Sequence, residues 1–95
     1  MGGSGVQDGA KNSVSYADIM LYPGSNHLLY RGGFIGLRFS GAGTMYYNRE
    51  NLAAYEGEWH RGRMHGYGTL YDKDGNVVWE GYFDRGRPVR PFWVL

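Results

Sequence analysis

Carboxylate and imidazole side chains gather in one short segment, YEGEWHRGRMHGYGTLYD at residues 55–72. Glu56, Glu58 and His60 occupy alternate positions, so an extended strand would place them on one face, and His65 could approach them across a turn. Carboxylate and imidazole groups are ligands for divalent metal ions. The solvated face of an amphipathic strand explains the same pattern without any coordination geometry, and we therefore expect no metal site.

Nucleophilic catalysis has less support still. The chain contains 3 histidines and no cysteine, which removes thiolate nucleophiles, thiolate zinc sites and disulfides together. No serine has acidic support, and no glycine-rich loop precedes a helical segment as a phosphate-binding loop does. We expect a protein that is not an enzyme and that uses no cofactor.

The length and charge of the chain also limit which classes of protein it can belong to. Its 95 residues suffice for one small domain, and a formal net charge of +1 gives no field strong enough to favour nucleic acid as a partner. No run approaches the roughly 18 apolar residues of a membrane span. We expect a cytoplasmic location, possible association with cytoskeleton or membrane, a disordered linker at residues 1–13 and a folded domain at 14–95.

A repeat with a period of 24 to 25 residues organises that domain. The rings and glycines of the unit that begins at Tyr55 recur in both directions along the chain, which indicates stacked units that bury their faces against one another. The later copies are Trp79, Gly81, Phe83 and Gly86, and the earlier ones are Tyr30, Gly32, Phe34, Gly41, Gly43, Thr44 and Tyr46. The predicted units are a half unit at about 15–29, full units at 30–54 and 55–78, and a terminal unit at 79–95.

Each unit reads as one β-hairpin. Rings and glycines alternate with polar residues over 53–60, Gly62 permits a tight reversal, and residues 66–72 return as a second strand. Leu37 stands where Gly62 stands in the next unit, so the first turn should differ in shape. Glycines on the strands leave space for large rings to lie across the backbone. The prediction is an all-β fold, an elongated antiparallel sheet of successive hairpins with six or seven strands.

The motif Tyr55-x-Gly57-x-Trp59-x-x-Gly62-x-x-His65-Gly66-x-Gly68 resembles the MORN (membrane occupation and recognition nexus) repeat. This resemblance implies a twisted sheet of hairpins that serves as a platform for protein interaction, with lipid binding as a second association of the family. It also implies a turn-stabilising hydrogen bond for His65. About three units are present, and the terminal ones are atypical because the Gly66-x-Gly68 pair maps to Ala17-x-Ile19 and to Arg90-x-Phe92, as capping units should be.

Arginines recur at the predicted turns, and hairpins stacked in register would gather them along one edge of the sheet. Guanidinium groups suit carboxylate and phosphate partners, although ordinary solvation of turns explains the same residues. The predicted anion-binding edge comprises Arg38, Arg61, Arg63, Arg85, Arg87 and Arg90.

We therefore expect a scaffold that binds a segment of another protein on its aromatic surface, helped by the arginine edge. Exposed rings would supply most of the binding energy. Two alternatives are a peripheral membrane module for anionic phospholipid and the regulatory repeat region of a larger enzyme, and homodimers through the terminal strands are possible. The predicted partner-binding rings are Tyr55, Trp59, Tyr67, Tyr71, Trp79, Phe83 and Trp93.

Overall fold

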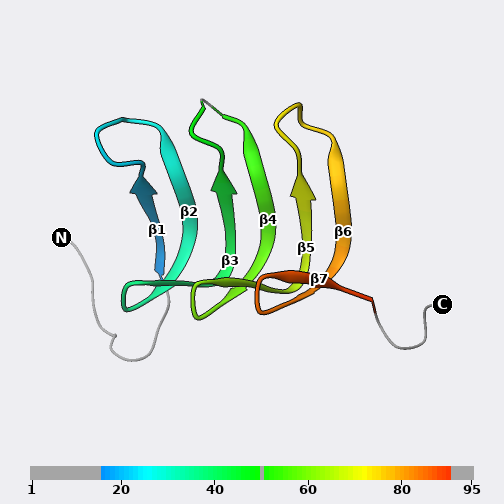
Figure 1. The fold of residues 1–95 in the computed structure, drawn as a ribbon. Coiled ribbons are helices and arrows are strands. Elements are labelled where there is room, and N and C mark those ends of the chain that lie inside the picture. Colours follow the sequence, from blue (N-terminus) through cyan, green and yellow to red (C-terminus); the bar gives the residue numbers. More distant parts are fainter. Residues whose placement is uncertain (1–15, 50, 91–95) are drawn as a thin grey trace.

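A computed structural model describes residues 16–49 and 51–90, and these form one open antiparallel sheet without a helix. The strands pair in chain order, so each pairs with the next to build successive hairpins (Figure 1). They are β1 (Tyr16–Leu21), β2 (Leu28–Ile35), β3 (Arg38–Tyr46), β4 (Ala53–His60), β5 (Arg63–Tyr71), β6 (Val77–Asp84) and β7 (Arg87–Val89). The all-β prediction is confirmed, and none of the described residues belongs to a helix that could cross a membrane.

The boundaries of β4 follow the alternation in its sequence. Tyr55 and Trp59 are buried on one face of the strand, whereas Glu56, Glu58 and His60 are exposed on the other. The return strand β5 begins earlier than predicted, because its first residue pairs directly with the last residue of β4. The connection is therefore only two residues long, which is the usual length of a tight hairpin turn.

The turn of the first hairpin differs in conformation from the other two turns, as the presence of Leu37 in place of a glycine predicted. Arg61 and Gly62 both have positive φ angles, of 53° and 81°, and Arg85 and Gly86 repeat this with 53° and 84°. Two positive φ angles in succession are typical of a type I′ turn. In the first hairpin the positive φ falls on Gly36, at 62°, and Leu37 does not share it, which is the glycine-first arrangement of a type II′ turn.

Aromatic rings form the core. The strands that carry them are strongly curved (Figure 1). Tyr30 stacks on Phe39 at 3.7 Å between ring centroids, and Trp59 meets both rings edge-on. Trp59 and Phe83 contact Tyr55 from either side, also edge-on. Edge-to-face contacts of this kind add to the energy of burial. A single sheet therefore builds a core without a second layer, because each curved strand encloses rings from its own hairpin and the next.

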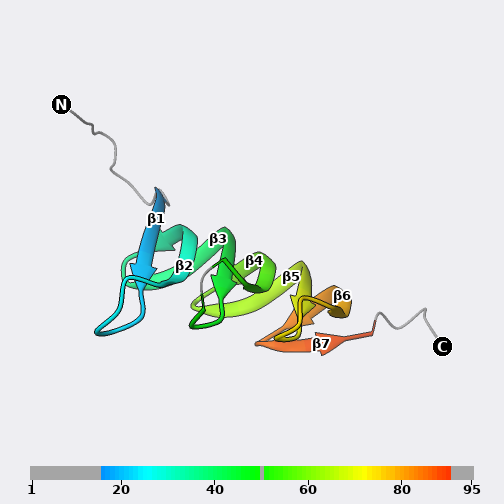
Figure 2. The same cartoon turned by 90° about the horizontal axis from the view of Figure 1, so that it is seen from above.

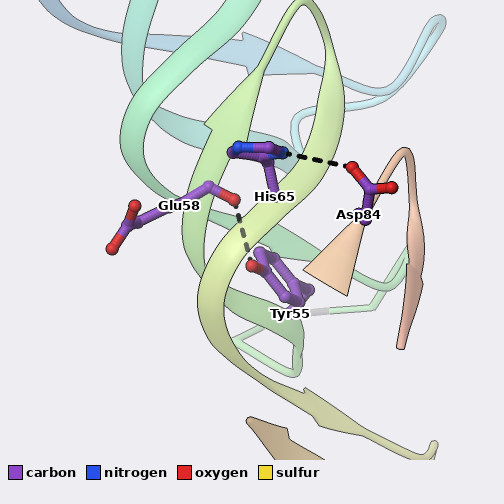
Figure 3. Close-up of polar contacts among 4 residues, drawn as sticks. All are labelled: Tyr55, Glu58, His65 and Asp84. Carbon is purple, nitrogen blue, oxygen red and sulfur yellow. Dashed lines mark hydrogen bonds and ion pairs between the residues drawn. The ribbon is translucent and has the colours of Figure 1, made fainter. Parts of the chain in front are cut away.

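One tether recurs at the same position of each hairpin and holds a ring inside the bend. The hydroxyl of Tyr30 donates a hydrogen bond of 2.9 Å to the carbonyl of Gly33, and Tyr55 does the same to Glu58 at 3.0 Å (Figure 3). Trp79 repeats the geometry through its indole N–H, which donates to the carbonyl of Tyr82 at 3.3 Å. Burial raises the pKa of Tyr55 to about 12, so this hydroxyl stays protonated and keeps donating even in moderately alkaline solution.

The strand glycines explain why these rings fit. A Cβ atom added to Gly43 would overlap the hydroxyl and ring of Tyr30, and one added to Gly68 would overlap those of Tyr55. Gly57 is closed in as well, because its Cβ would lie 2.5 Å from the Cα of Gly68. The prediction that strand glycines leave space for large rings is thus confirmed, because the tyrosine rings lie directly against these glycines.

Tyrosines also link the repeats at the loop edge, which is the edge of the sheet opposite the tight turns. The sequence did not predict these links. The hydroxyl of Tyr22 donates to the carbonyl of Tyr46 at 2.7 Å, and Tyr47 donates to the carbonyl of Tyr71 at 2.7 Å. The third loop has Asp72 at the equivalent position, where its carboxylate accepts backbone N–H groups of its own loop instead. These hydrogen bonds hold the pKa of Asp72 below its ordinary value.

The Tyr47→Phe variant should lose this link between the loop after β3 and the end of β5. We expect the free energy of unfolding to fall by about 1 kcal/mol, the usual worth of one intramolecular hydrogen bond. A loss of that size lowers the melting temperature of a domain this small by about 4 to 8 °C. Tyr46→Phe is the matched control, since the hydroxyl of Tyr46 makes no hydrogen bond among the described residues. Equal thermal melts for the two variants would contradict the link.

Candidate interaction surface

The structure removes three of the predicted partner-binding rings from the surface. Tyr55, Trp59 and Phe83 are 1%, 5% and 2% exposed and form the core. The prediction that these three rings contact a partner is therefore wrong, because the curvature of the strands encloses the face that carries them. Trp79 is half-buried beside the core cluster, and Trp93 lies outside the described residues.

Tyr67 remains a surface ring and has a companion. It pairs across the sheet with Tyr82 on β6, and the two rings meet edge-on at 5.5 Å between centroids. They are 49% and 45% exposed, so a partner could pack against both. Tyr71, also predicted, is half-buried and donates a hydrogen bond of 2.9 Å to Glu56, which raises the pKa of its hydroxyl.

Tyr82 was missed although its signal was present in the sequence. Val78, Glu80 and Tyr82 alternate with the core-facing residues of β6, so the same period-two argument that selects Tyr67 also selects Tyr82. The pairing of the two rings required the register of β5 against β6, in which Gly68 stands opposite Gly81.

A groove lies at the turn edge of the sheet, on the outer face that also carries Tyr67 and Tyr82. Its volume is about 490 Å³. Backbone hydrogen bonds position the turns that line it: Gly62 donates to the carbonyl of Phe39 at 2.9 Å, and Gly86 donates to that of Met64 at 3.0 Å. Each turn is thus fixed against the return strand of the hairpin before it. The lining residues are Arg38, His60, Arg61, Arg63, His65, Asp84 and Arg85.

Four of the six arginines predicted for the anion-binding edge therefore share one groove. Arg87 begins β7 and Arg90 follows that strand, and neither lines the groove. The loop that contains Asp72 and Asp74 lies at the opposite edge of the sheet, between β5 and β6 (Figure 1). Four arginines therefore line the turn edge, and these two carboxylates lie at the opposite edge.

Two imidazoles accompany the arginines. The rings of His60 and His65 lie 5.3 Å apart between centroids, and Nδ1 of His65 is 3.9 Å from a carboxylate oxygen of Asp84 (Figure 3). His65 thus contacts Asp84 of the next hairpin. Among the described residues, no three His, Asp or Glu side chains are arranged to hold a metal ion.

The chemistry that this arrangement supports is anion binding. Guanidinium groups from three successive hairpins face solvent around the groove, with one carboxylate among the lining residues. Such groups form charge-assisted hydrogen bonds with carboxylate and phosphate oxygens. The exposed pair stands on the same two strands as His65 and Asp84: Tyr67 follows His65 by two residues, and Tyr82 precedes Asp84 by two. Charge and aromatic surface are therefore adjacent.

Comparisons with known proteins agree with this architecture. The family model described as the MORN repeat matches residues 55–77, the segment that spans β4, β5 and the following loop. No curated protein and no solved structure matches the chain. MORN repeats are generally non-enzymatic modules for interaction with proteins or membranes. The chain therefore contains a MORN repeat at residues 55–77.

Proposed function

We propose that this protein is a non-enzymatic interaction module that binds an acidic segment of a partner protein along its turn edge. The observation that carries the proposal is the groove in which Arg38, Arg61, Arg63 and Arg85 converge. Charge complementarity supports an acidic occupant, because carboxylate side chains match this lining and basic segments are repelled by it.

The exposed pair of Tyr67 and Tyr82 supports a protein ligand in particular. Aromatic side chains at the centre of an interface commonly supply much of its binding energy, and a charged rim determines orientation and association rate. Here the ring pair and the arginine groove occupy neighbouring positions on β5 and β6. A partner segment with acidic residues next to an apolar one would use both.

A second candidate is attachment to anionic membranes, and one residue favours it. Leu37 is 93% exposed at the tip of the first turn, directly before Arg38. An exposed apolar tip beside basic residues suits insertion into the headgroup region of an anionic bilayer. One such side chain with four arginines supports weak and salt-sensitive attachment, since each basic residue contributes only about 1 kcal/mol near the surface.

The Tyr67→Ala variant separates the two candidates. For a protein ligand, we expect it to weaken binding of a fluorescent glutamate-rich peptide with one central tryptophan by about 1 kcal/mol or more, roughly fivefold in Kd. Fluorescence anisotropy at physiological salt measures this, and flotation with phosphatidylserine vesicles is run beside it. The Leu37→Ser variant is the matched control, and it should affect flotation alone. Vesicle binding at physiological salt without peptide binding would overturn the proposal.

A further inference from the structure

Two of the 3 histidines of the chain line the groove at the turn edge. His60 is the last residue of β4 and is the Cα partner of Arg63, the first residue of β5. His65 follows Arg63 by two residues, and alternate residues of a strand share one face. The two imidazoles are exposed, and their ring centroids are 5.3 Å apart. Both therefore belong to the same surface as the groove arginines.

Guanidinium groups reach this pair of imidazoles from each neighbouring element. Arg61 follows His60 directly in the turn between β4 and β5. On one side of that turn, the Cβ of Arg38 lies 3.9 Å from the position that a Cβ on Gly62 would occupy. On the other side, Arg85 is in the turn after β6, which is hydrogen-bonded to β5. The tight turns follow one another along one edge (Figure 1), and the hairpins keep the same order when seen from above (Figure 2).

Two carboxylates also lie near the imidazoles. Asp84 on β6 places a carboxylate oxygen 3.9 Å from Nδ1 of His65 (Figure 3). Glu58 precedes His60 by two residues on β4, and its carboxylate lies against Gly66, the residue after His65. Four arginines line the groove and outnumber these two negative charges. The surroundings of the imidazoles are therefore cationic even when both imidazoles are neutral.

Imidazole is the side chain whose charge changes near neutral pH. Carboxyl groups ordinarily titrate at about pH 4, and phenol and guanidinium groups at about pH 10 and above, whereas imidazole does so between about pH 5 and 8. A bound anion favours the protonated imidazole, so the complex takes up protons as it forms. The affinity for an anion consequently rises as the pH falls, and this gain is absent in alkaline solution.

We infer that the groove is a proton-coupled anion site, in which His60 and His65 bind the acidic segment once they are protonated. This inference rests on the proposed function and adds to it two ligand-binding residues and a dependence on pH. The four arginines that line the groove supply a constant positive charge. The two imidazoles add charge in mildly acidic solution and so adjust the affinity for the same ligand.

The affinity for a peptide at different pH values tests the inference. We expect the Kd of the glutamate-rich peptide, measured by fluorescence anisotropy at constant ionic strength, to fall about tenfold from pH 7.5 to pH 5.5, because two exposed ion pairs are gained. A peptide with cysteic acid in place of glutamate should show the same change, since its sulfonate groups stay ionised throughout. The second peptide thus separates protonation of the protein from protonation of the ligand.

Histidine variants assign the effect to the two imidazoles. The double variant with His60→Gln and His65→Gln should bind either peptide within about twofold of the original protein at pH 7.5 and should gain nothing at pH 5.5. The matched control is His27→Gln, because His27 lies in the loop between β1 and β2, away from the groove. This variant should keep the full gain. Circular dichroism at each pH establishes that every variant is folded.

Calorimetry measures the proton uptake itself. Titration of the peptide in two buffers of different ionisation enthalpy, at a pH near 6.5, should show protons taken up by the original protein and none by the double variant. A Kd that does not change with pH, or an equal gain in the double variant, would overturn the inference and leave the proposed function standing. No binding of either peptide at any pH would overturn both.

Discussion

Gly68→Ala should destabilise the protein by about 1 to 3 kcal/mol, the usual cost of overpacking a core. The reason is the ring of Tyr55, which lies directly on this glycine and leaves no space for a single added carbon. Tyr55 is unable to move aside without loss, because it is 1% exposed and donates a hydrogen bond to the carbonyl of Glu58. Urea or thermal unfolding followed by tryptophan fluorescence would measure the change.

The matched control is Gly81→Ala, one strand away. Gly81 stands directly opposite Gly68 in the pairing of β5 with β6, and neither glycine has a positive φ. A Cβ on Gly81 would lie 3.3 Å from Nε1 of Trp79, a contact that a small shift relieves. Alanine is also favoured over glycine in a strand interior, so this variant should be close to neutral. Similar losses for the two variants would show that the ring of Tyr55 does not lie on Gly68.

Reversal of four arginines should remove ligand binding while the fold persists. We expect the variant with glutamate at positions 38, 61, 63 and 85, the arginines that line the groove, to bind a glutamate-rich peptide about 100-fold more weakly, since four exposed ion pairs are lost and replaced by repulsion. All four side chains are exposed at the turn edge and are absent from the aromatic core. Their replacement should therefore change the melting temperature little.

Two measurements show whether a loss of binding results from the changed charge or from unfolding of the variant. Circular dichroism and thermal melting establish that the reversed variant is folded. A lysine-rich peptide of equal length should bind the reversed variant and not the original protein, because the sign of the edge has changed. Retained affinity of the folded variant for the glutamate-rich peptide would exclude the turn edge as the binding surface.

The sequence determined the hairpin architecture because its information is local and periodic. Alternation of Tyr55, Gly57 and Trp59 with polar residues predicts β4, and the absence of glycine at Leu37 predicts a different first turn. Both features depend on a few consecutive residues and on the φ angles that each residue tolerates. Repetition at a fixed period then extends one hairpin to the whole sheet.

Only the tertiary structure decided which rings are surface and which are core. Alternation separates the two faces of a strand, and it does not reveal that β4 curves until Tyr55 and Trp59 are enclosed. The hydrogen bond from Tyr47 was also hidden, because its acceptor is a backbone carbonyl, which leaves no trace in residue type. Side-chain identity thus predicted the strands and the gathering of turn arginines along one edge. Curvature and register decided that His65 meets Asp84 and that Tyr67 meets Tyr82.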